Sequence, residues 1–279
     1  MQPVRTTGRL TDAEISAVLE LAAAAERADG VYPLSEDVVL AVRHGGGTHL
    51  RTDAGYAFVG DESGELVVDP DHRRRGHGTA LLRAAGTGPL TFWAHGDGAA
   101  ARAFAEKAGF DRVRVLWQMR RSLDEDLPDS PLPAGVTLRH FRPGHDEEAW
   151  LAVNSRAFAH HPEQGRWTGR DLALREAEPW FDPAGFLLAV DIEDTLLGFH
   201  WTKIQNGLGE IYVLGVDPGG HRKGLGKALS VAGLQYLKQR GLTTASLYAD
   251  ESNTAAVGMY RRLGFRVHST DVSYRTHAA

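Results

Sequence analysis

The stretch Asp69-Pro-Asp-His-Arg-Arg-Arg-Gly-His-Gly-Thr-Ala-Leu81 recurs 148 residues later as Asp217-Pro-Gly-Gly-His-Arg-Lys-Gly-Leu-Gly-Lys-Ala-Leu229. Seven of the thirteen positions are identical. A second block of matches follows in the same order, 155 residues apart: Ala100-Ala101 with Ala255-Ala256, and Gly109-Phe110 with Gly264-Phe265. Two matched blocks at nearly one spacing indicate an internal duplication; the alternative is a chance coincidence of two glycine-rich turns.

The two copies flank a stretch with the composition of a linker. Residues 122–135 hold three prolines and four acidic residues, with no helical or strand period. Proline lacks the backbone N–H that regular structure needs. We therefore expect an N-terminal domain over residues 1–121, a linker over 122–135 and a C-terminal domain over 136–279, which suits the usual size of domains.

Helical and strand patterns alternate in both halves, which predicts the α/β class with two tandem domains, each a mixed central sheet flanked by helices. The predicted helices cover residues 12–27, 76–85, 100–108, 146–159, 171–178, 224–240 and 253–263. The predicted strands cover residues 56–60, 65–69, 90–94, 112–119, 136–141, 186–190, 196–203, 210–217, 244–249 and 267–275.

Composition narrows the classes of function. The net charge of -5 argues against nucleic acid as a partner, because phosphate neutralisation needs a basic face. No apolar run approaches the ~18 residues that span a bilayer, and the first ten residues lack an apolar signal core, so we expect no membrane partner. The absence of cysteine excludes disulfides, thiolate zinc sites and cysteine nucleophiles. We expect a cytoplasmic monomer without a metal, since no His-Glu-x-x-His pattern accompanies the histidines.

The segment His221-Arg-Lys-Gly-Leu-Gly-Lys227 carries the sharpest chemical signal. It lies between a predicted strand and a long predicted helix, whose N-terminus offers unpaired N–H groups and a positive dipole end. Gly224 and Gly226 allow a phosphate to approach that backbone, which predicts a pyrophosphate cradle. Ala228 stands where a Walker A loop needs Ser or Thr, so that motif is excluded. A basic turn that caps a helix is the alternative.

The surroundings of this cradle resemble the GCN5-related N-acetyltransferase superfamily. The resemblance rests on Val213-Leu-Gly-Val-Asp-Pro218, on Arg222-x-x-Gly-x-Gly-x-Ala, and on Asn253-x-x-Ala-x-x-x-Tyr260-x-x-x-Gly264-Phe265. It covers both halves of the chain. It implies two tandem acetyltransferase-like domains, with acetyl-coenzyme A as the acetyl donor.

Further strings resemble the mycothiol synthase family more specifically. They are Trp93-Ala-His-Gly, His161-Pro-Glu-Gln-Gly, Trp180-Phe-Asp-Pro-Ala-Gly185, Gly198-Phe-His-Trp-Thr-Lys203 and Gly209-Glu-Ile-Tyr-Val-Leu-Gly-Val-Asp-Pro218. This resemblance implies acetylation of the cysteinyl amine of cysteinyl-glucosaminyl-inositol, the last step to mycothiol. The alternatives are acetylation of another amine, such as a peptide N-terminus or an amino sugar, and a non-catalytic acyl-coenzyme A sensor.

Two residues are expected to carry the chemistry. Glu210 is a natural base for an amine that must lose a proton, although a solvated edge-strand carboxylate is the alternative. Tyr260 lies two helical turns after Asn253 and matches the superfamily's acid for the departing thiolate, whereas a core tyrosine is the alternative. A strand locally opened at Gly215 would free backbone groups for the thioester and pantetheine amides.

The resemblance also implies the contact residues. Coenzyme A would contact Leu66, Val67, Val68, Arg74, Arg75, Gly76, His77, Gly78, Thr79, Leu214, Gly215, Val216, His221, Arg222, Lys223, Gly224, Leu225, Gly226, Lys227, Asn253, Thr254, Ala255, Ala256, Val257 and Gly258. The amine substrate would contact Glu36, Glu163, Lys203, Glu210 and Tyr248. Glu36 could equally be part of an ordinary helix start.

The two halves are not equivalent. The repeat sets Ala105 opposite Tyr260, Gly98 opposite Asn253 and Glu62 opposite Glu210. The first half keeps the cradle but lacks the acid, so we expect catalysis in the second half and a non-catalytic first half.

Overall fold

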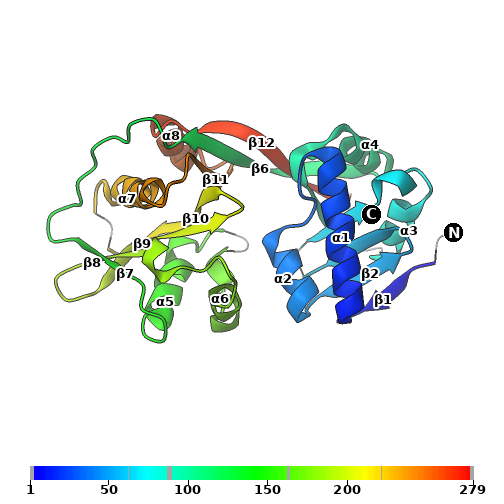
Figure 1. The fold of residues 1–279 in the computed structure, drawn as a ribbon, viewed down its shortest axis with the longest axis horizontal. Helices are drawn as coiled ribbons and strands as arrows, with labels where there is room; N and C mark the ends of the chain where they lie inside the picture. Colours follow the sequence, from blue (N-terminus) through cyan, green and yellow to red (C-terminus); the bar gives the residue numbers. More distant parts are fainter. Residues whose placement is uncertain (1–2, 62, 87–89, 162–163, 221, 277–279) are drawn as a thin grey trace. The chain divides into compact units, whose positions relative to one another are not determined.

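The computed structural model describes residues 3–61, 63–86, 90–161, 164–220 and 222–276. These form two compact units (Figure 1). Unit 1 holds the chain up to Trp117 together with Asp250–Ser252 and the segment from Ser269 onward. Unit 2 holds Gln118–Ala249 and Asn253–His268. The expected ranges 1–121 and 136–279 treat each half as contiguous, whereas unit 1 also takes Asp250–Ser252 and the chain from Ser269 onward.

Unit 1 is a sheet of strand order β1-β2-β3-β4-β5-β12-β6, to which β12 contributes its C-terminal part. Its strands are β1 (Arg5–Thr7), β2 (Thr48–Thr52), β3 (Gly55–Val59), β4 (Gly64–Val68), β5 (Thr91–Ala94), β6 (Phe110–Ser122) and β12 (Arg266–Thr276). Its helices are α1 (Asp12–Asp29), α2 (Glu36–His44), α3 (His77–Ala84) and α4 (Ala99–Lys107). The β4–β5 pair is parallel, and β5 pairs antiparallel with β12.

Local signals fix where the helices of unit 1 begin and end. Thr11 and Glu14 form a capping box at the start of α1, and Gly30 ends it in the left-handed conformation. Apolar residues of α1 and α2 pack on Tyr56 and Val67, on one face of the sheet. Leu81 of α3 packs on the opposite face. Unit 1 is therefore a three-layer arrangement.

Unit 2 has the strand order β12-β6-β11-β10-β9-β8-β7, to which β12 and β6 contribute only the parts that belong to this unit. The remaining strands are β7 (Thr137–His140), β8 (Phe186–Val190), β9 (Leu196–Gln205), β10 (Leu208–Val216) and β11 (Thr244–Asp250). The helices are α5 (Glu147–Ala157), α6 (Gly169–Glu176), α7 (Leu225–Gln239) and α8 (Thr254–Arg262). The β10–β11 pair is parallel, as is β4–β5 in unit 1.

Large aromatic side chains fill the core between the sheet of unit 2 and α5. Trp150 and Trp201 are fully buried, and Phe186 stacks on Trp201 with ring centroids 4.4 Å apart. Leu225 and Leu229 of α7 pack on the other face, against Ala189 and Leu197. Side chains of this size bury about 150–250 Å² each, so this core holds β8 and β9 firmly.

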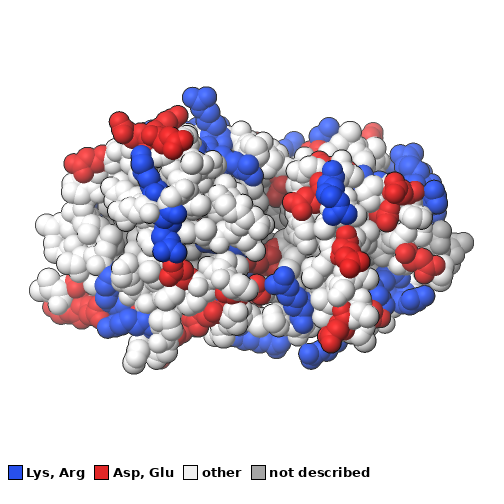
Figure 2. Space-filling view, in the orientation of Figure 1, with Lys and Arg blue, Asp and Glu red and all other residues white. Residues whose placement is uncertain are grey.

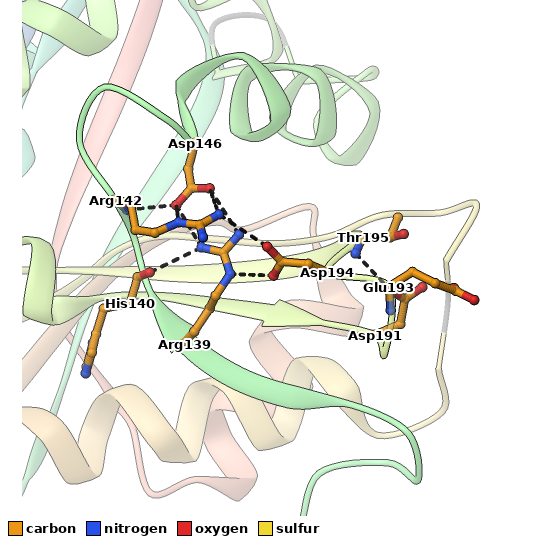
Figure 3. A network of polar contacts seen from close by, with 8 residues as sticks. All are labelled: Arg139, His140, Arg142, Asp146, Asp191, Glu193, Asp194 and Thr195. Atoms are coloured by element: carbon orange, nitrogen blue, oxygen red, sulfur yellow. Dashed lines mark hydrogen bonds and ion pairs between the residues drawn. The ribbon is translucent and has the colours of Figure 1, made fainter.

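A charged network closes the turn from β7 into α5 (Figure 3). Arg139 and Arg142 both donate to the carboxylate of Asp146, and both also reach Asp194 in the turn between β8 and β9. Burial raises the pKa of Asp146, but the two arginines outweigh it and hold that pKa well below its ordinary value. The network ties three separate segments of unit 2 together.

The predicted helices and strands are confirmed, with ends shifted by a few residues. The sequence analysis missed α2, β1 and β2. Residues 126–133 lie in neither a helix nor a strand, as expected for the linker. Basic and acidic side chains lie interspersed on the face that Figure 2 shows. Within the described part of the chain, no helix is long and apolar enough to cross a membrane.

Candidate active site

Strands β10 and β11 separate in the middle of unit 2. Within the described residues their parallel ladder has three pairs and ends at Ile211 and Leu247. On its other side β10 stays paired with β9 as far as Val216 and Gly198. From Val213 to Val216 the backbone of β10 is thus bonded along one edge and open along the other. An extended amide chain such as pantetheine can bond to an edge of this kind.

The irregularity that accompanies the opening lies earlier than expected. The register of β10 against β9 shifts between Ile211 and Val213, which makes Tyr212 the extra residue of a bulge. Gly215, the expected point of distortion, keeps its register opposite Phe199. A Cβ atom at Gly215 would lie 2.8 Å from the Phe199 ring, so this glycine serves close packing. The opening includes Gly215, as expected, but the irregularity of the strand lies at Tyr212.

Helix α7 begins as the cradle hypothesis requires. Gly224 caps it in the left-handed conformation, with φ of 88°, and Leu225 and Gly226 form its first turn. A Cβ atom at Gly224 would have no neighbour within 4 Å among the described residues, which therefore leave space in front of the helix. Burial lowers the pKa of His200 to about 4, which makes its ring neutral, and Nδ1 donates to the Leu229 carbonyl at 2.7 Å. This contact fixes α7 on β9.

A cavity of about 430 Å³ lies at this helix start. Its lining residues are Pro128, Arg222, Gly224, Gly226, Lys227, Met259, Arg262 and Leu263. The sequence analysis missed Pro128, Met259, Arg262 and Leu263, because only the fold brings the linker and the end of α8 beside α7. Among the described residues, no carboxylate pairs with the side chains of Arg222, Lys227 or Arg262. A cavity with unpaired cations and a helix N-terminus fits the phosphates of coenzyme A.

Tyr260 lies on α8, which Asn253 caps by accepting a hydrogen bond from the Ala256 N–H at 3.1 Å. Residues 254–258 form the first turns of this helix. The Tyr260 ring packs edge-on against Phe265, with centroids 5.7 Å apart. Burial raises the pKa of Tyr260 to about 12, so the phenol keeps its proton at neutral pH, as a general acid must.

Glu210 and Lys203 are directly opposite each other on β10 and β9. Lys203 is only 8% exposed, and its Nζ lies 4.7 Å from the centroid of the Trp180 ring and 5.2 Å from that of Tyr212. Two aromatic faces thus stabilise a lysine charge that an apolar strand alone would not tolerate. The structure brings these two predicted residues together beside the opening of β10.

Arg175 is a further residue of this region that the sequence analysis missed. It is buried on α6, and its guanidinium stacks on Trp167, 3.8 Å from the ring centroid. Its Nε donates to the Tyr212 hydroxyl at 2.7 Å. The arginine therefore fixes the bulge residue that lies between Glu210 and the open edge. This hydrogen bond joins two residues that are 37 positions apart in the sequence, so no local pattern predicts it.

The structure does not bring the other predicted substrate-binding residues next to Glu210 and Lys203. The Tyr248 hydroxyl accepts a hydrogen bond from Gln118 at 2.8 Å on a side chain that is 44% exposed. Glu36 is the first residue of α2 in unit 1, after the cap Ser35. Glu163 and His221, together with Glu62 of the repeat comparison, lie outside the described residues.

Unit 1 repeats the cradle in a modified form. Gly76 caps α3 with φ of 91°, and Arg74 also has a positive φ, of 63°. The predicted contact His77 is buried, and its ring is hydrogen-bonded to the Thr52 hydroxyl. Its backbone N–H has no partner within the helix, because His77 is the first residue of α3. The ladder of β4 with β5 ends at Glu65 and Trp93, so Leu66, Val67 and Val68 follow a comparable opening. Among the described residues, no group of metal-ligating side chains was found.

Two units that each open a parallel strand pair beside a glycine-rich helix start have the architecture of a tandem acetyl-coenzyme A-dependent N-acetyltransferase. Models of the acetyltransferase (GNAT) family and of a GNAT domain match residues 144–265 and 35–112. A tandem GNAT protein of the clavulanic acid pathway covers 99% of the chain, with a TM-score of 0.72 and 19% identity, and supports the fold. A GCN5-related N-acetyltransferase from Sphaerobacter thermophilus has a TM-score of 0.69, 26% identity, and covers 99% of this chain and 96% of its own.

Curated relatives narrow the class further. The mycothiol acetyltransferase of Salinispora arenicola is 53% identical over 98% of this chain and 96% of its own length. That of Thermomonospora curvata is 53% identical over 96% of this chain and 95% of its own. The chain belongs to the mycothiol acetyltransferase family.

The matched cradles allow a test of the two units. Gly226→Leu should abolish acetyl transfer, because the new side chain would block a phosphate. Among the described residues its Cβ would contact only Val216, at 3.7 Å, so the change itself is tolerated by the fold. We expect calorimetry to find residual coenzyme A binding in this variant, from the cradle of unit 1. Gly78→Leu, the matched change in α3, should leave transfer intact and remove that binding.

Two results would contradict these expectations. A Gly226→Leu variant that binds no coenzyme A would mean that the first cradle is not a binding site. Robust acetyl transfer in that variant would mean that the catalytic unit is wrongly assigned.

Proposed function

We propose that this enzyme transfers the acetyl group of acetyl-coenzyme A to the cysteinyl amine of cysteinyl-glucosaminyl-inositol, the last step of mycothiol synthesis. The observation that carries the proposal is the pairing of Glu210 and Lys203 beside the open edge of β10, in a chain related over its full length to mycothiol acetyltransferases. A polyhydroxylated amine needs charged and hydroxyl partners, which Glu210, Lys203 and Tyr248 would supply, joined by Glu163 from the family resemblance.

In the proposed mechanism Glu210 accepts the proton of the amine, directly or through a water molecule, as the nitrogen attacks the thioester carbonyl. Backbone N–H groups between Leu214 and Val216, on the open edge of β10, donate to the carbonyl oxygen as it gains charge. Tyr260 then donates its proton to the sulfur atom as the C–S bond breaks. The bound thioester supplies the activated acetyl group.

We also propose that catalysis needs no metal, because Glu210 and Tyr260 provide both proton transfers. The acting form would be a cytoplasmic monomer. The cysteine-free composition and the use of acetyl-coenzyme A, a metabolite of the cytoplasm, support that location.

The acceptor can be identified with a free-thiol assay on a panel of amines. With acetyl-coenzyme A as donor, we expect selective turnover of the cysteinyl pseudodisaccharide over a peptide N-terminus and an amino sugar. Preference for one of the other amines would overturn the assignment of the acceptor. Binding of acetyl-coenzyme A without turnover of any amine would indicate a sensor.

Tyr260→Phe tests the general acid. The change removes the proton donor but keeps the ring that packs on Phe265, so turnover should fall by ~10²–10⁴-fold while coenzyme A affinity stays close to wild type. Steady-state kinetics combined with calorimetry separate the two effects. Unchanged turnover would remove Tyr260 from the mechanism.

Glu210→Gln tests the base. The amide cannot accept a proton, so the rate should fall most at neutral pH and least at high pH, where the amine is already deprotonated. The pH–rate profile of the variant, compared with wild type, measures this. A profile of unchanged shape would place the base on another residue.

A further inference from the structure

Three charged side chains from distant segments meet in the interior of unit 1. Glu65 lies on β4, Asp271 lies on β12, and His95 follows β5; the two carboxylate residues are 3% and 5% exposed. His95 Nδ1 lies 3.0 Å from Asp271 Oδ2, and Nε2 lies 3.2 Å from Glu65 Oε1. An imidazole ring therefore stands between two buried carboxylates.

The remaining carboxylate oxygens have partners of their own. Glu65 Oε2 accepts from the Ser35 N–H, and Asp271 Oδ1 accepts from the Gly96 N–H, both at 2.8 Å. The ring thus has a carboxylate oxygen near each nitrogen: Nδ1 is hydrogen-bonded to Asp271, whereas Nε2 lies within ion-pair distance of Glu65 without a hydrogen bond. Burial alone would lower the pKa of His95, but Glu65 and Asp271 outweigh it and raise that pKa to about 10. Two carboxylates within 3.2 Å of the ring nitrogens thus favour the protonated form of His95.

The cluster lies at the end of the β4–β5 ladder. The equivalent position in unit 2 is where the acceptor amine is proposed to bind. The ladder of β4 and β5 ends at Glu65 and Trp93, just as β10 and β11 separate after Ile211. Glu65 shares the face of β4 with Val67, which packs on α1 and α2. In unit 2 the corresponding face of β10 carries Glu210. This comparison rests on the function proposed for unit 2.

We infer that Glu65 and Asp271 form a buried site for a small organic cation, and that His95 fills it from within the chain. The side chain of His95 takes the place of an external amine, so unit 1 is closed to an acceptor at the point where its strands separate. Unit 1 would then lack acetyl transfer for two reasons: Ala105 replaces the general acid, and His95 occupies the place of the acceptor. When the side chain of His95 is removed, the site should bind a small cation with one positive charge, such as imidazolium.

Chemical rescue of the full-length chain tests this inference. His95→Ala should lower the Tm by about 10 °C, because two buried carboxylates lose their cation. Imidazole at about pH 6, where it is protonated, should restore most of that loss. Pyrazole has the same shape but is neutral at this pH, so it should restore little. Neither compound should change the Tm of the wild-type chain.

A second variant tests whether a carboxylate of this site binds the imidazolium ion. In the double variant His95→Ala with Glu65→Gln, imidazole should raise the Tm much less than in His95→Ala alone. Equal rescue by imidazole and pyrazole would overturn the inference, since it would indicate a filled cavity without charge recognition. No rescue by either compound would overturn it as well.

A measurement on the wild-type protein covers the case in which His95→Ala does not fold. NMR of isotope-labelled histidine should find His95 doubly protonated at about pH 8, with His95→Gln used for assignment. The titratable groups that face this ring are Glu65 and Asp271. A neutral His95 ring at that pH would overturn the inference. None of these readouts depends on acetyl transfer, so they succeed or fail separately from the proposed function.

Discussion

Beyond Ile211, strand β10 pairs with β9 and with no other strand in the described part of the chain, and the polar groups along its other edge need partners. A buried backbone group without a partner costs about 1–3 kcal/mol, so an opening inside a sheet persists only where the neighbouring structure is strongly held. Strand β9 meets that condition, because residues 196–203 are all buried. The open edge is therefore a fixed feature of unit 2 that a ligand rich in amides can complete.

The packing around this edge explains the residue types found there. Gly215 lets β10 pass close to the Phe199 ring, and Arg175 holds Tyr212 at the bulge. Glu210 and Tyr212 are two residues apart, so both lie on the side of the aromatic core. The bulge brings Val213 to that side as well, opposite Trp201. Lys203 is stabilised over the same aromatic rings. The charged side chains of Glu210 and Lys203 therefore lie on a rigidly packed core. Orienting a polar substrate requires charged groups that are held in place.

The sequence predicts the parts of the molecule whose signals are local. The cradle, the cap Asn253 and the alternation of helices and strands depend on neighbouring residues, and the repeat doubles each signal. Other features depend on which segments meet in space. They are the return of the chain from Ser269 onward to unit 1, the bulge at Tyr212 and the position of Arg262. His95 and Asp271 are 176 residues apart, so their pairing has no local pattern. Such contacts depend on the register of the assembled sheet.

The two units differ mainly in side chains, whereas the backbone features that local sequence determines are present in both. A phosphate cradle is made of backbone N–H groups and glycines, so Gly76 and Gly224 keep it through large changes of sequence. Amine chemistry depends on side chains of one face, and these are free to change once one unit suffices. In unit 1 that face carries Glu65 with an internal cation, whereas in unit 2 it carries Glu210 beside an open edge. The two units thus share a glycine-capped helix start beside a parallel strand pair, while the side chains at the end of that pair differ.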